Sequence, residues 1–173
     1  MVSQPSIQIV AGETFAIAPV VKLQDEWFND TTASATVSAT VIRTVGPVTT
    51  RSETLTVSAV AGIADFSNIS TSASASPGYQ LRFAIESATE TLPASPFLSA
   101  QFTVLPADPF SFKFAQDGNF ATSQESGLTL KSVTGSAIVL EVLDVFGNRV
   151  ATDNTTVFAA NVTSGSNTVT SLN

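Results

Sequence analysis

Cysteine and histidine are absent from the 173 residues of this chain, and charged residues make up only 12% of it. Without cysteine, the chain has no disulfide and no thiolate metal site. Without histidine and cysteine, it lacks the usual general base and the thiolate nucleophile of enzymes. The sequence contains no glycine-rich phosphate loop and no spacing of carboxylates typical of glycoside hydrolysis. The sequence therefore predicts a protein that is not an enzyme.

Positive charge is also scarce, with 7 Lys and Arg against 14 Asp and Glu and a net charge of −7. The seven cations are scattered singly, so we expect neither nucleic acid nor an anionic membrane surface as a partner. The sequence contains no run of 18 or more apolar residues, so it predicts no membrane-spanning helix. The first five residues lack the charged and apolar regions of a signal peptide, so we expect an exported form to be a mature chain or an excerpt. The absence of cysteine favours a bacterial or protist exterior over an animal one.

Serine and threonine are abundant and together form roughly a quarter of the chain. Threonine and valine favour strands because branching at Cβ suits a pleated, half-buried surface. Apolar residues alternate with other residues, as in strands with one buried face, in segments 15–23, 37–41, 55–57, 64–66, 79–85, 102–104, 110–114 and 138–142. No window of twelve residues carries a helical apolar stripe. The pattern predicts an all-β fold.

An internal repeat follows a proline-rich joint at residues 105–109. Residues 20–29 align with residues 139–148, so that Asp25 matches Asp144 at a separation of 119 residues (144 − 25). The second copy is shorter, since only 29 residues follow Asp144 (173 − 144). We therefore predict one domain over residues 1–105 and a partial second domain over residues 106–173. Either the chain is cut from a longer array, or a neighbouring molecule supplies the missing strands.

Several motifs in the first copy resemble bacterial immunoglobulin-like repeats of the invasin and intimin type, which also occur in surface proteins of algae and protists. The motifs are Gln4-Pro5-Ser6, Ala11-Gly12-Glu13-Thr14-Phe15, Pro19-Val20-Val21-Lys22-Leu23-Gln24-Asp25 with Asn29, Gly62-x-Ala64-x-Phe66-x-x-Ile69 and Gly78-Tyr79-x-Leu81-x-Phe83. Two features depart from the family. Phe28 stands where the family prefers the glycine that Gly147 provides, and the period exceeds the usual length of roughly 90–100 residues.

The resemblance implies tandem immunoglobulin-like β-sandwiches, the second incomplete within this chain, on an extracellular or cell-surface protein. It implies a non-catalytic spacer or stalk in an adhesin, surface filament or flagellar hair, with neighbouring repeats or identical subunits as partners. Two alternatives stay open: a module that binds a glycan or a surface protein, and a self-assembling fibre or lattice subunit completed by strand exchange.

Acidic and amide side chains cluster after two of the expected strands. Asp25 and Asp30 follow the first, and Asp144 and Asn148 follow the second. Such oxygen ligands suit calcium, which is the one cofactor that these residues indicate. The alternative is that the aspartates bond to their own backbone in Asx-turns, which loops of this kind use.

Two aromatic residues are expected to have structural roles. Tyr79 opens an alternating segment, where its ring would pack while its hydroxyl bonds to backbone, as in the tyrosine corner of sandwich domains. Trp27, the only tryptophan, is expected to cap the core of its own sandwich, with exposure for sugar stacking or domain docking as the alternative.

Four asparagines lie in sequons, and in a eukaryotic surface protein several of them could carry glycans. These glycosylation candidates are Asn29, Asn68, Asn154 and Asn161.

Overall fold

Strands form all the regular structure of residues 1–43, 53–88, 96–115, 136–159, 162–163 and 168–169, which a computed structural model of the chain describes. The strands are β1 (Gln8–Val10), β2 (Val20–Lys22), β3 (Ala35–Arg43), β4 (Thr54–Ser58), β5 (Ile63–Asp65), β6 (Ser76–Ala88), β7 (Phe97–Leu98), β8 (Phe102–Leu105), β9 (Ser111–Phe114), β10 (Leu140–Leu143), β11 (Val162–Thr163) and β12 (Thr168–Val169). The predicted all-β class is confirmed. In these ranges no helix is long and apolar enough to span a bilayer.

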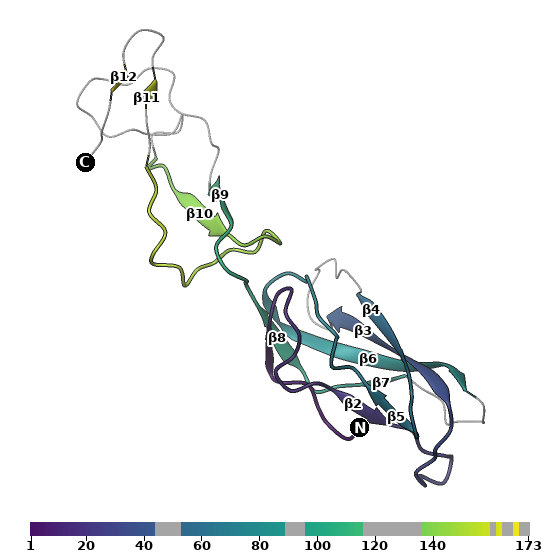
Figure 1. Cartoon of the computed structure of the whole chain (residues 1–173). Coiled ribbons are helices and arrows are strands. Elements are labelled where there is room, and N and C mark those ends of the chain that lie inside the picture. Colours follow the sequence, from purple (N-terminus) through teal and green to yellow (C-terminus); the bar gives the residue numbers. More distant parts are fainter. Residues whose placement is uncertain (44–52, 89–95, 116–135, 160–161, 164–167, 170–173) are drawn as a thin grey trace.

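Strands β1 to β8 form one body, which we call the N-terminal body (Figure 1). Its larger sheet has the order β1-β8-β6-β3-β4, with β7 paired to β6, and its smaller sheet contains β2 and β5. The pairs are antiparallel except for β1 with β8, which run parallel in the register Gln8↔Thr103 to Val10↔Leu105. The first and last strands of the body therefore lie side by side.

The hydrophobic core of the N-terminal body is built from alternating strand residues. Each of these positions points inward because successive side chains in a strand point to opposite faces. Strands of both sheets contribute to one cluster, so the core lies between the sheets. The central contributors are Val37, Ala39 and Val41 of β3, Tyr79, Leu81 and Phe83 of β6, Val21 of β2 and Ala64 of β5.

The segment 15–23, predicted to alternate as one strand, departs from that prediction. Only Val20–Lys22 is a strand, and Ile17 is exposed although Phe15 and Val21 on the predicted face are buried. The chain bends at residues 16–17, and Pro19 has no backbone N–H with which to lengthen the ladder. The strand therefore begins only after the proline.

Strands β9 and β10 form a separate antiparallel pair, which we call the ribbon (Figure 1). Its register runs from Leu140↔Phe114 to Leu143↔Ser111. Phe112 and Phe114 on β9 and Phe110 before it are exposed, although their alternation predicted an inward face. In the part of the chain that the structure describes, β9 and β10 pair with each other alone, and an isolated pair is marginally stable in water.

Candidate functional site at the joint between β8 and β9

The ribbon meets the N-terminal body through residues 144–148, which we call the second Asp loop. Asp144 lies at the carboxyl end of β10 and is 1% exposed. Its Oδ1 accepts hydrogen bonds from the backbone N–H groups of Phe146 (2.9 Å) and Asn148 (2.8 Å). Its Oδ2 accepts from Nδ2 of Asn148 and from the N–H of Ala107 in the joint, both at 2.8 Å. One carboxylate thus fixes both its own loop and the segment that enters β9.

Two side chains of the second Asp loop contact the N-terminal body. Oδ1 of Asn148 accepts a hydrogen bond of 2.8 Å from the backbone N–H of Ala75. The ring of Phe146 lies over Gly12, so closely that a Cβ on Gly12 would be 2.7 Å from the ring Cζ. Gly12 also has a φ of +85°, which other residues rarely adopt. We call Gly12 and Ala75 the seat of the loop.

The electrostatics of Asp144 favour the ionised carboxylate. Burial acts to raise its pKa, but hydrogen bonds from Asn148, Ala107 and Phe146 outweigh burial and leave the pKa below its usual value. The donors around the carboxylate are N–H groups, whose positive ends point at the oxygens. These contacts are charge-assisted and therefore stronger than bonds between neutral groups.

Residues 25–29, the first Asp loop, have the same local geometry in the N-terminal body. Oδ1 of Asp25 accepts from the N–H groups of Trp27 and Asn29 (2.9 Å each), and its Oδ2 accepts from Nδ2 of Asn29 (3.1 Å). The N–H of Asp25 donates to the carbonyl of Asn29, and the N–H of Phe28 donates to the carbonyl of Asp25. Each of these bonds recurs 119 residues later in the second loop. Within the aligned segments, the Asp loop is therefore repeated in its hydrogen bonds as well as in its sequence.

The two loops differ in what covers their tips. Trp27 is 74% exposed and Phe28 is 79% exposed, whereas Phe146, the counterpart of Trp27, is 37% exposed because one part of its ring lies on the seat. The prediction that Trp27 caps the core of its own body is therefore wrong. The hydrogen bonds to Asp25 hold the turn in a shape that directs Trp27 outward, and Phe28 has a φ of +63° at its end.

The four residues predicted as calcium ligands use their oxygens for other contacts. Asp25, Asp144 and Asn148 hold the two Asx-turns and the seat, and Asp30 forms an ion pair of 2.5 Å with Lys22. A cation at either loop would face the positive ends of N–H groups. In the described ranges no cluster of three or more acidic residues is arranged to hold a metal ion. The geometry favours the hydrogen-bonded turn.

Three of the four glycosylation candidates are exposed: Asn29, Asn68 and Asn154. Asn161 lies outside the described residues. Nδ2 of Asn29 donates to Asp25, so a glycan attached to this atom would compete with the turn.

Tyr79 supports the same end of the N-terminal body from within. Its side chain is fully buried, and its hydroxyl donates a 2.9 Å hydrogen bond to the carbonyl of Ser74, next to the seat residue Ala75. Its ring stacks on Phe102 of β8 at 6.0 Å. Burial raises the pKa of the Tyr79 hydroxyl, which therefore stays protonated as a donor.

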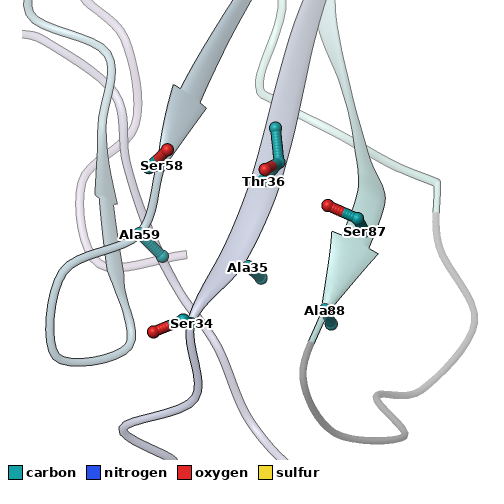
Figure 2. A pocket seen from close by; sticks show the side chains of 7 residues that line it. All are labelled: Ser34, Ala35, Thr36, Ser58, Ala59, Ser87 and Ala88. Atoms are coloured by element: carbon teal, nitrogen blue, oxygen red, sulfur yellow. The ribbon is translucent and has the colours of Figure 1, made fainter.

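A hollow of about 360 Å³ lies at the start of β3 and the ends of its neighbours β4 and β6 (Figure 2). Its lining consists of Ser34, Ala35, Thr36, Ser58, Ala59, Ser87 and Ala88. These side chains offer methyl and hydroxyl groups, and none of them titrates near neutral pH. The hollow therefore has no acid or base with which to catalyse a reaction.

Sequence reasoning found Asp144 and Asn148 and offered calcium binding or an Asx-turn as their role, but it did not find the seat. Gly12 and Ala75 precede Asn148 by more than 70 residues, so no local pattern links them. The available signal was the pairing of Asp25 with Asp144, which marked the loop without naming its contacts. Comparison of the chain with models of known protein families, with curated proteins and with solved structures finds no match.

Proposed function

We propose that this chain is a non-catalytic structural segment of an extracellular surface protein. It consists of tandem immunoglobulin-like β-sandwiches, one over residues 1–105 and one, incomplete within the chain, over residues 106–173. Its role is that of a spacer or stalk in an adhesin, a surface filament or a flagellar hair.

The observation that carries the proposal is the seated second Asp loop. A spacer has to hold successive modules in a defined direction, and contacts confined to a flexible linker would not do so. Here one buried carboxylate binds the linker at Ala107, while Asn148 and Phe146 of the same loop bind the end of the preceding body. The joint is thereby held by the protein itself.

The strand order suits a load-bearing role. The chain passes through the N-terminal body from β1 to β8, and these two strands are parallel neighbours. Tension would pull β1 by its amino end and β8 by its carboxyl end, so the hydrogen bonds between them would be sheared together rather than opened one by one. The bonds from Ala11 to Leu105 and from Thr103 to Ile7 extend this ladder at both ends.

A distance measurement across the joint tests the proposal. Because the chain has no cysteine, spin labels can be placed at two introduced cysteines, Thr56→Cys on β4 and Ser111→Cys on β9, both exposed positions. A stiff joint gives a narrow distance distribution by double electron–electron resonance. We expect Asn148→Ala with Phe146→Ala to broaden it, and Val145→Ala, an exposed neighbour, to leave it unchanged. A broad distribution in the otherwise unaltered chain would contradict the spacer role.

The exposed tip of the first Asp loop favours a second candidate function, the binding of a glycan. Exposed tryptophan stacks well on flat apolar faces, and Trp27 and Phe28 stand together at the tip. A glycan array probed with the whole chain separates the two functions. Binding that Trp27→Ala abolishes would favour recognition, and no binding would favour the spacer.

A further inference from the structure

The tip of the first Asp loop is built like the loop that is already seated at the joint. Trp27 and Phe146 occupy equivalent places, 119 residues apart, in turns with the same hydrogen bonds. Resting on the proposed function, we infer that the first Asp loop docks onto the seat of a second copy of the N-terminal body. The partner of the tip is thus the seat, Gly12 and Ala75, of another N-terminal body.

Matching positions support this choice of partner. In the second Asp loop, Nδ2 of Asn148 donates to Asp144 while its Oδ1 accepts from Ala75. In the first loop, Nδ2 of Asn29 donates to Asp25 in the same way, and this places its Oδ1 where it can accept an N–H of the same kind. An aromatic ring and an amide at the positions that bind the seat are therefore both present, in a turn with the same hydrogen bonds.

The locations of tip and seat suit a linear arrangement. The seat lies at the end of the N-terminal body next to the ribbon, and the loop after β2 lies at the far end of that body (Figure 1). A contact between the tip of one body and the seat of another uses two different surfaces. Such head-to-tail contacts form open rows wherever the rotation between successive copies does not close a ring.

The exposure and strain of the tip indicate that it is kept for a contact. Two adjacent aromatic side chains, 74% and 79% exposed, are unfavourable in water. Phe28 also has a φ of +63° at a position where the second loop has Gly147. A bulky residue in this conformation is strained, and such strain is common where a side chain is held for binding.

In the unaltered chain, Phe146 already lies on the seat. The test therefore needs a second N-terminal body that lacks Phe146 and is placed ahead of the tip of the first Asp loop. The test protein is a tandem fusion. Residues 1–115 of one copy, the leading copy, are joined directly to residues 3–173 of a second copy, the trailing copy. Ala115 can replace Val2 because their N–H groups bond to equivalent carbonyls, those of Val139 and Val20. Trp27→Phe in the leading copy leaves Trp27 of the trailing copy as the single fluorescent reporter.

We expect acrylamide quenching of the trailing Trp27 to fall about twofold relative to the single chain, because Phe146 on its seat is 37% exposed whereas the free Trp27 is 74% exposed. Gly12→Ala in the leading copy should restore quenching, since its Cβ would occupy the space of the ring. The matched control is Gly12→Ala in the trailing copy, which affects only the seat of Phe146 and should leave the quenching low.

Spin labels at Thr56→Cys and Ser111→Cys in the trailing copy report on the stiffness of the joint, while Trp27 quenching reports on docking. The same molecule thus tests the spacer role and the docking inference separately. A narrow distance distribution with Trp27 as accessible as in the single chain would overturn the docking inference and keep the spacer role. If the tandem chain does not fold, the unaltered chain is mixed with a high concentration of a second chain carrying Phe146→Ala and Asn148→Ala, whose seat is vacant. No shift of the Trp27 indole NMR signal of the unaltered chain would then overturn the inference.

Discussion

At the scale of single residues, two glycines with similar backbone angles differ in the space around them. Gly62 has a φ of +74° and Gly147 a φ of +83°, a region in which other residues cost about 1–2 kcal/mol. A Cβ on Gly62 would lie 1.8 Å from the carbonyl oxygen of Thr31, whereas a Cβ on Gly147 would meet nothing within 4 Å. The backbone of the loop before β3 thus lies directly against Gly62.

We therefore expect Gly62→Ala to lower the free energy of unfolding by about 3 kcal/mol, from backbone strain together with overpacking. Gly147→Ala adds strain alone, so its cost should be about 1–2 kcal/mol. Equilibrium urea unfolding followed by circular dichroism measures both. Equal losses for the two variants would show that the close approach to Thr31 has no effect.

Phe28 presents the opposite case, a bulky residue where the repeat has a glycine. Replacing it with glycine relieves strain of about 1–2 kcal/mol and adds about 0.5–1 kcal/mol of backbone entropy cost. We expect Phe28→Gly to stabilise the N-terminal body by up to about 1.5 kcal/mol, as judged by urea unfolding. Destabilisation would mean that the ring makes contacts that its 79% exposure does not suggest.

At the scale of elements, the second Asp loop makes the joint sensitive to acid. The folded-state pKa of Asp144 is below its usual value of 3.8, so ionised Asp144 contributes stability that is complete above that value. This contribution is lost as the pH falls from about 4 towards the lowered pKa. A protonated carboxyl would present an O–H among N–H donors and could no longer accept all of their bonds.

The distance distribution between labels at Thr56→Cys and Ser111→Cys should therefore stay narrow from pH 7 to about 4.5 and broaden at lower pH. Asp144→Asn should be broad already at pH 7, because its amide points N–H groups at Ala107 and at Asn148. Asp25→Asn serves as the matched control, since Asp25 has the same turn but no contact at the joint. If the distance distribution of Asp144→Asn is narrow at pH 7 and still broadens in acid, the pH dependence comes from another group.

At the scale of the whole molecule, the ribbon depends on the body to which it is joined. A two-stranded pair is marginal in water, and among the described residues the aromatic partner of Phe112 on β9 is Phe158, in an edge-to-face contact at 5.1 Å. Much of the order in β9 and β10 should then come from the seated loop. The N-terminal body has its own core and does not share this dependence.

Hydrogen exchange checks this asymmetry. In the Phe146→Ala, Asn148→Ala chain we expect β9 and β10 to lose most of their amide protection, while β3 and β6 keep theirs. Val145→Ala, a change of an exposed residue in the same loop, should alter neither. If the ribbon stays protected in the double variant, the joint contacts are not what orders it.

What the sequence by itself determined was the strand character of the chain, the inward positions of β3 and β6 and the recurrence of the Asp loop. Alternation along β3 and β6 identified Val41 and Leu81 as buried, because the pleat links each position to a face without reference to distant residues. The same local reasoning paired Asp25 with Asp144 and offered the Asx-turn as a use for both.

Only the tertiary structure decided which copies of these local features are covered. Trp27 and Phe146 stand in the same turn, yet one faces solvent and the other lies on Gly12. The alternating phenylalanines of β9 are exposed for the same reason, since no second layer faces them within the described residues. Burial depends on which distant segment is adjacent, and periodicity along the chain contains no information about that neighbour.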